Sequence, residues 1–140
     1  MTKPPSWFYV AAVILILWEC IGCYAYISQV SMTAADMAQL PVAQQEIWKM
    51  MPSWVTSAYA IAVWIGLAGG VLLLLRFKAA RTAYIVSLVA VIAQFGWTFA
   101  ATPILTTVGP TAAIFPLFII AVGVFAIWFA GKAAANGWLR

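Results

Sequence analysis

The sequence predicts an all-α, polytopic membrane protein: a four-transmembrane-helix bundle in one domain covering residues 1–140. Two observations carry this prediction. Hydrophobic residues make up 66% of the chain and charged residues only 7%, whereas about a quarter of the residues of soluble domains are charged. The apolar residues also form long blocks that match the roughly 20 residues a helix needs to cross a bilayer. The lipid bilayer is therefore the expected surrounding of the chain.

The predicted spans follow from these apolar blocks and from the charged residues, prolines and glycines that separate them. In order, they cover residues 7–30, 54–75, 82–105 and 111–131. The first contains one charged residue, Glu19, and is too long for the core of a signal peptide. The short basic connection at 76–81 makes the second and third spans an antiparallel hairpin, and Gly109-Pro110 predicts a tight turn before the fourth.

Residues 31–53 form the one sizeable polar segment, and they predict short helices outside the spans. Thr33 and Asp36 have the spacing of a capping box. Pro41 suits the first turn of a second helix, whose apolar and polar residues fall on opposite faces. Such a helix either lies in the membrane interface with Trp48 as an anchor, or caps the mouth of the bundle.

The distribution of cations predicts the orientation. The segment 31–53 holds one cation, Lys49, and all the others lie on the opposite side of the predicted membrane. These others are Lys3, Arg76, Lys78, Arg81, Lys132 and Arg140. Cytoplasmic segments carry the excess of Lys and Arg. We therefore expect an inner-membrane protein with both termini in the cytoplasm and 31–53 outside.

The composition argues against an enzyme. Histidine is absent, and the only acids are Glu19, Asp36 and Glu46. The usual acid–base catalyst, the commonest metal ligand and the usual axial haem ligand are therefore missing. We expect no catalytic residue, no metal site and no cofactor. The net charge of +4 is explained by topology, so it does not indicate a nucleic-acid partner.

Glu19 and Gln94 are the candidate polar core, because both lie near the middle of predicted spans. An acid at this depth costs a few kcal/mol even on lenient scales. Small and polar residues accompany each of them at helical spacing, which predicts that the first and third spans face each other. Either a hydrogen bond between the two side chains fixes the register of the helices, or Glu19 is a protonatable site for a transported solute.

Three tryptophans, Trp18, Trp64 and Trp97, are predicted at the same depth as Glu19 and Gln94. Together these five residues are candidates for the lining of a small pocket that accepts a ring-shaped or apolar ligand. The alternative is that the indoles only fill space within the bundle, as large aromatic side chains commonly do.

The second span carries small residues at intervals of four, among them Ala62, Gly66 and Gly70. This pattern permits two helix backbones to approach closely. The stripe is therefore a predicted helix-packing surface, and its partner is either another span of this chain or another protein.

Several stretches together resemble a small four-helix family of bacterial membrane proteins, whose members are mostly uncharacterised and sometimes labelled "sugar transporter". The resemblance covers nearly the whole chain and implies the four-helix topology. It lies in Trp7-Phe-Tyr, Leu17-Trp-Glu-Cys-Ile-Gly-Cys-Tyr, Gln39-Leu-Pro, Pro52-Ser-Trp and Ala60-Ile-Ala-Val-Trp-Ile-Gly-Leu.

Two functions follow from these features. The absence of catalytic groups and the several packing surfaces favour a non-catalytic accessory or structural subunit of a larger membrane assembly, whose partners are other membrane subunits or further copies of this chain. The alternative is an oligomeric transporter of a small sugar- or drug-like solute, with Glu19 as the coupling acid.

Overall fold

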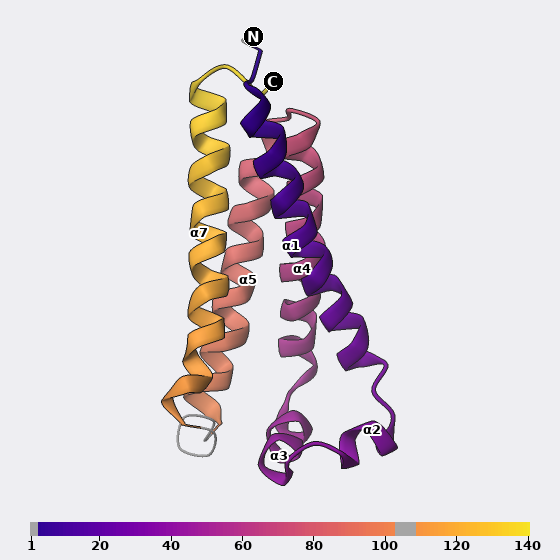
Figure 1. The fold of residues 1–140 in the computed structure, drawn as a ribbon. Helices are drawn as coiled ribbons and strands as arrows, with labels where there is room; N and C mark the ends of the chain where they lie inside the picture. Colours follow the sequence, from indigo (N-terminus) through magenta and orange to yellow (C-terminus); the bar gives the residue numbers. More distant parts are fainter. Residues whose placement is uncertain (1–2, 103–108) are drawn as a thin grey trace.

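The computed structural model describes residues 3–102 and 109–140, and every regular element among them is a helix (Figure 1). These elements are α1 (Ser6–Val30), α2 (Ala34–Ala38), α3 (Val42–Met50), α4 (Ser53–Leu74), α5 (Ala79–Ala101), the 3-10 turn η1 (Pro110–Ala113) and α7 (Ile114–Ala135). Four of them, α1, α4, α5 and α7, are long and apolar enough to cross a membrane. The predicted all-α bundle of four membrane helices is thus confirmed.

The helix boundaries differ from the predicted spans at the third and fourth helices. α5 begins at Ala79 instead of residue 82 and ends at Ala101, whereas its predicted end at 105 falls outside the described residues. α7 begins at Ile114, after η1, and continues to Ala135. Hydropathy marks the part of a helix that crosses hydrocarbon, whereas hydrogen bonding extends the helix over adjoining charged residues such as Lys132.

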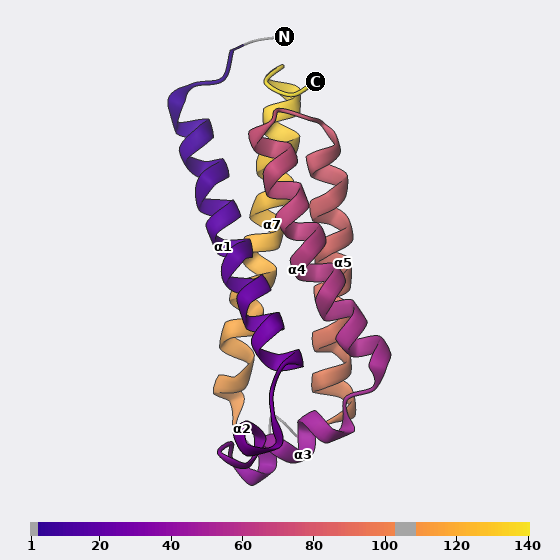
Figure 2. The same ribbon diagram turned by 90° about the vertical axis from the view of Figure 1, so that its right-hand side faces the viewer.

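The long helices pack in the order α1, α4, α5, α7, and the α4–α5 hairpin makes the most extensive contact. Figures 1 and 2 show both chain ends and the α4–α5 turn at one end of the bundle, with α2 and α3 at the opposite end. The segments that carry the predicted cytoplasmic cations therefore share one end of the molecule.

Backbone hydrogen bonds tie the carboxyl-terminal residues to the α4–α5 turn. Arg76 adopts a left-handed conformation with φ 68° directly after α4. Its carbonyl accepts from the Arg140 amide at 2.8 Å, and the Lys78 amide donates to the Arg140 carbonyl at 2.9 Å. The Arg76 Nε also donates to the Trp138 carbonyl at 2.8 Å. These bonds hold Arg76 in a conformation that ordinarily favours glycine.

An aromatic cluster fills the same end of the bundle. Phe8 stacks on Phe129 at 5.7 Å, and Trp138 meets Phe8 edge-on at 5.7 Å and Trp7 at 5.4 Å. Phe8, Phe129 and Trp138 are all buried. Aromatic pairs of this geometry add about 0.5–1.5 kcal/mol each beyond their burial. The helices are therefore tightly closed at the end where the two chain termini lie.

The opposite end has the predicted short helices. The Thr33 hydroxyl accepts from the Asp36 amide and the Asp36 carboxylate accepts from the Thr33 amide, both at 3.2 Å, so the capping box is confirmed. α3 begins after Pro41 and ends before Pro52, which precedes α4. Because these two prolines bound it, α3 is a separate helix that lies at this end of the bundle, below the start of α4 (Figures 1 and 2).

Candidate functional site

A cavity of about 580 Å³ lies among the four long helices and reaches α3. Tyr84 and Gly123 line its inner end, and Trp48 and Met51 line its outer end, next to α3. Interior voids of proteins are rarely larger than a water molecule, but this space is lined in part by exposed residues such as Ile21 and Ala25, so it is a cleft that opens between the helices and not an enclosed void. A space of this size is typical of ligand-binding cavities, which measure about 300–1,000 Å³.

Glu19 reaches this cavity from the middle of α1, and a glycine on α4 makes room for its carboxyl group. A Cβ atom at Gly66 would lie 2.5 Å from Oε2, 2.7 Å from Cδ and 2.8 Å from Oε1 of Glu19. Real Cβ atoms do not approach other atoms so closely. The absence of a side chain at Gly66 therefore leaves the space, or seat, that the Glu19 carboxyl group occupies, and Gly66 is also a point of contact between α1 and α4.

The small-residue stripe of α4 packs against helices of this chain. A Cβ at Gly70 would lie 2.8 Å from Ile16 Cγ1 on α1 and 3.4 Å from the Tyr84 hydroxyl on α5. Ala62 is 3% exposed, and its carbonyl accepts from the Ser87 hydroxyl at 2.6 Å. The stripe thus fills the space between α1 and α5, and its partner is within the molecule.

Tyr84 carries a buried polar atom that lacks a partner. The side chain is 2% exposed and lines the cavity, and its hydroxyl has no hydrogen bond within the described residues. The hydroxyl lies beside Gly70, one helical turn from the glycine that seats Glu19. An unsatisfied buried hydroxyl costs about 1–3 kcal/mol, so such groups usually mark a site that something else completes.

The hydrogen bond between Glu19 and Gln94, one of the two predicted roles of this pair, is not formed among the described residues. Both side chains line the cavity. α1 packs on α4 rather than forming a close pair with α5. Helical periodicity identified the inward face of each helix, but not which helix lies opposite it. Glu19 of α1 and Ser87, Gln94 and Thr98 of α5 all line this cavity, so the two helices meet across it and not as a closely packed pair.

The three central tryptophans separate in the structure. Trp18 lines the cavity and packs against Phe118 and Phe115 of α7, with ring centroids 5.4 and 6.3 Å apart. Trp64 is 43% exposed, and neither it nor Trp97 belongs to the described lining. Depth alone was the basis for grouping the indoles, and depth does not fix the direction in which a side chain points.

The lining residues that were not predicted as such include the aromatic residues Trp48, Tyr59 and Tyr84. Trp48 lies on α3 and belongs to the lining of the cavity, a position that agrees with a helix lying over the mouth of the bundle and is compatible with one lying in the membrane interface. Tyr84 had a detectable signal, because it precedes Ser87 by three residues on the stripe that continues to Gln94.

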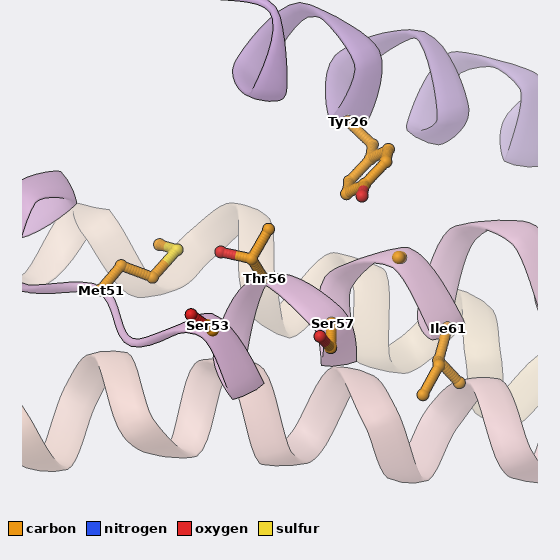
Figure 3. Close-up of a pocket in the computed structure, with 7 residues that line it drawn as sticks. Tyr26, Met51, Ser53, Thr56, Ser57 and Ile61 are labelled. Carbon is orange, nitrogen blue, oxygen red and sulfur yellow. The ribbon is translucent and has the colours of Figure 1, made fainter.

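A second, more open groove of about 590 Å³ lies outside the first, at the start of α4. Figure 3 shows Tyr26 pointing from α1 toward the first turns of α4, where Ser53, Thr56 and Ser57 lie. Met51 lines both spaces. Tyr26 also meets the cavity residue Tyr59 edge-on at 5.3 Å. The groove therefore adjoins the outer part of the central cavity.

No protein-family model, curated protein or solved structure matches this chain. The chemistry of the cavity therefore carries the functional argument. Among the described residues, no three His, Cys, Asp or Glu side chains are grouped so that they can hold a metal ion. The cavity lining offers the Glu19 carboxyl group, the Gln29 and Gln94 amides and the unpartnered Tyr84 hydroxyl, which bind a solute by hydrogen bonds or charge.

Proposed function

We propose that this protein binds a small sugar- or drug-like solute in the central cavity and, as an oligomer, carries it across the membrane. The observation that supports this proposal most directly is the cavity itself, whose lining includes the acid Glu19 and Tyr84, a residue whose buried hydroxyl has no hydrogen-bond partner among the described residues. A helix bundle whose role is only structural gains stability by filling such a space and pairing such a group. A solute supplies both the missing volume and the missing partner.

The shape of the molecule supports a site that opens on one side at a time. The aromatic cluster of Phe8, Phe129 and Trp138 closes the end near the termini, while the cavity extends toward α3 at the other end. Four helices are too few to surround a solute along its whole path across the membrane, so we include a second copy of the chain in the proposal. Glu19 is the coupling acid in this mechanism, because it is the acid that lines the cavity.

The orientation belongs to the same proposal. We place the end that carries Lys3, the α4–α5 turn and Arg140 in the cytoplasm of a bacterium, and α2 and α3 outside its inner membrane. The cation asymmetry supports this placement. The cavity then faces the exterior in the conformation described.

The accessory-subunit hypothesis depends on exposed apolar helix surfaces as contacts for other proteins, but lipid can cover the same surfaces equally well. Large apolar side chains such as Ile14, Leu117 and Trp128 are exposed on α1 and α7. Exposed apolar residues are expected wherever a helix meets lipid, so they do not by themselves indicate a protein partner. The central cavity has no role in that hypothesis, which is why we favour the solute-binding protein.

Two measurements test the proposed function. Purification in mild detergent followed by mass determination should give a homo-oligomer, whereas a stable complex with other proteins would support the accessory subunit. Proteoliposomes with an internal pH indicator should respond to a solute from a panel of amines, sugars and organic anions. The Glu19→Gln variant should fold normally but lose this response, because an amide cannot release a proton.

Matched substitutions show whether the cavity is the site. Ala25 is exposed and lines the cavity, so Ala25→Trp should fill part of that space and block the response. Ala121 is an exposed residue of α7, so Ala121→Trp should place the same indole in lipid without effect. Equal responses from the two variants would contradict the proposal.

A further inference from the structure

The charges around the central cavity have one sign only. Glu19 is the acidic residue of its lining, and no Lys or Arg belongs to the lining that the structure describes. The described cations instead occupy the ends of the molecule, such as Arg76 and Arg140 in the α4–α5 turn and the carboxyl-terminal tail. A buried anionic ligand needs a compensating positive group, which this cavity lacks. The lining therefore favours a cationic ligand.

The two polar groups nearest the glycine stripe suit a head group that donates hydrogen bonds. The Glu19 carboxyl lies over Gly66, and the unpartnered Tyr84 hydroxyl lies beside Gly70, one turn away. A primary ammonium group carries three N–H donors on one compact centre, so it can donate to the carboxylate and to the phenolic oxygen together. A quaternary ammonium group has no N–H to donate.

The rest of the cavity suits an apolar body. Aromatic side chains from four different elements, Trp18, Trp48, Phe95 and Phe115, belong to its lining. The Ser87 and Thr98 hydroxyls donate to backbone carbonyls, at 2.6 and 3.1 Å. Apart from Glu19 and Tyr84, the other polar side chains of the lining are Gln29, Tyr59 and Gln94, and most of the lining is apolar, which suits an apolar body better than a sugar with its many hydrogen-bonding groups.

We infer that the ligand of the central cavity is a primary amine with an aromatic or alkyl body, bound as its ammonium ion. Its nitrogen makes an ion pair with Glu19 and donates a hydrogen bond to the Tyr84 hydroxyl, and its body lies among the aromatic side chains toward α3. This inference rests on the proposed function and narrows its solute to one chemical class.

Four probes that share one body test the head group. We take 4-phenylbutylamine as the ammonium probe, its trimethylated form as the quaternary cation, 4-phenylbutanol as the uncharged form and 4-phenylbutyrate as the anion. Binding of each is measured by equilibrium dialysis against the purified full chain in detergent, with empty detergent micelles as the blank. The primary amine should bind at least about tenfold more tightly than the alcohol, as expected for a charged hydrogen-bonded pair.

Substitutions show how much of the affinity for the primary amine comes from the Glu19 carboxyl group and how much from the Tyr84 hydroxyl group. Glu19→Gln should weaken the primary amine about tenfold or more and leave the alcohol unchanged. The matched control is Glu46→Gln, which removes an exposed acid from α3 and should leave all four probes unaffected. Tyr84→Phe should weaken the primary amine about two- to tenfold, because it removes one hydrogen bond, but should leave the quaternary cation unchanged.

The outcomes separate this inference from the proposed function. If the alcohol or the anion binds as tightly as the amine, and Ala25→Trp blocks that binding, the cavity is a solute site and the amine assignment is wrong. If Ala25→Trp and Ala121→Trp bind every probe as the unaltered protein does, both the amine inference and the proposed site are wrong. Equal loss of the primary and quaternary cations in Tyr84→Phe would overturn the role of the hydroxyl.

Discussion

The contact between Gly66 and Glu19 allows a prediction whose magnitude follows from the distances between the two residues. In Gly66→Ala the new Cβ lies 2.5–2.8 Å from three atoms of the Glu19 carboxyl group. Non-bonded carbon contacts are optimal at about 3.5–4.0 Å, so the carboxyl must retreat by roughly 1 Å. Displacing a side chain from its rotamer costs about 0.5–1.5 kcal/mol, and overpacking a core site about 1–3 kcal/mol. We expect Gly66→Ala to lower the free energy of unfolding by about 1–3 kcal/mol relative to a glycine replaced without a clash.

Gly96 provides that reference, because nothing lies within 4 Å of a Cβ built on it. Gly96→Ala makes the same chemical change inside a membrane helix and should be neutral or stabilising by up to about 1 kcal/mol. Subtracting the effect of Gly96→Ala from that of Gly66→Ala removes the difference in helix propensity and leaves the clash with Glu19. The measurement is reversible unfolding in mixed micelles of mild detergent and dodecyl sulfate.

A double-mutant cycle identifies the clashing group. In Glu19→Ala, the side chain ends at Cβ, so adding Gly66→Ala should cost no more than Gly96→Ala does. The expected coupling energy between positions 19 and 66 is therefore about 1–3 kcal/mol. If Gly66→Ala is as stable as Gly96→Ala, or keeps its cost in the Glu19→Ala background, the carboxyl group does not occupy the seat over Gly66.

Three further predictions follow from the same structure. Tyr84→Phe should raise the free energy of unfolding of the empty protein by up to about 1–3 kcal/mol, measured by the same titration, because it removes a buried hydroxyl without a partner. Ser87→Ala should lower it by about 0.5–2 kcal/mol through loss of the 2.6 Å hydrogen bond to the Ala62 carbonyl, and a change within 0.2 kcal/mol would refute that bond's contribution. In a cysteine-free background, an impermeant thiol reagent added outside cells should label Ala35→Cys but not Ala79→Cys, and the reverse pattern would overturn the orientation.

The sequence was sufficient to predict the architecture because lipid imposes a simple rule. A helix that crosses hydrocarbon must satisfy its own backbone and present apolar side chains, so composition and length reveal each span. The capping box of Thr33 and Asp36 was predictable for a similar reason, since both hydrogen bonds are local in sequence. The start of α5 at Ala79 was not, because helical hydrogen bonding continues beyond the apolar block.

The site was only partly predictable, because it depends on which helices are neighbours. Glu19, Gln94 and Trp18 were recognised by polarity and depth, and all three line the cavity. Trp64 was grouped with them by depth alone and faces outward instead. In a membrane, both faces of a helix are apolar, so the hydrophobic periodicity that distinguishes inside from outside in soluble proteins is weak. The small residues of α4 were more informative, because they mark where another backbone approaches.

The glycine stripe of α4 links the packing of the helices to the placement of the acid. Gly70 lets α1 approach α4 at Ile16, and Gly66, one turn away, receives the Glu19 carboxyl that the approach brings in. An acid that served only to fix the register of two helices would be expected to bond with the helix it faces, yet the one it faces here offers a glycine. The nearby Tyr84 hydroxyl is likewise left without a partner in the described structure. The same packing that brings α1 onto α4 therefore leaves a carboxyl and a hydroxyl beside one cavity, and that is the arrangement a solute with its own donors completes.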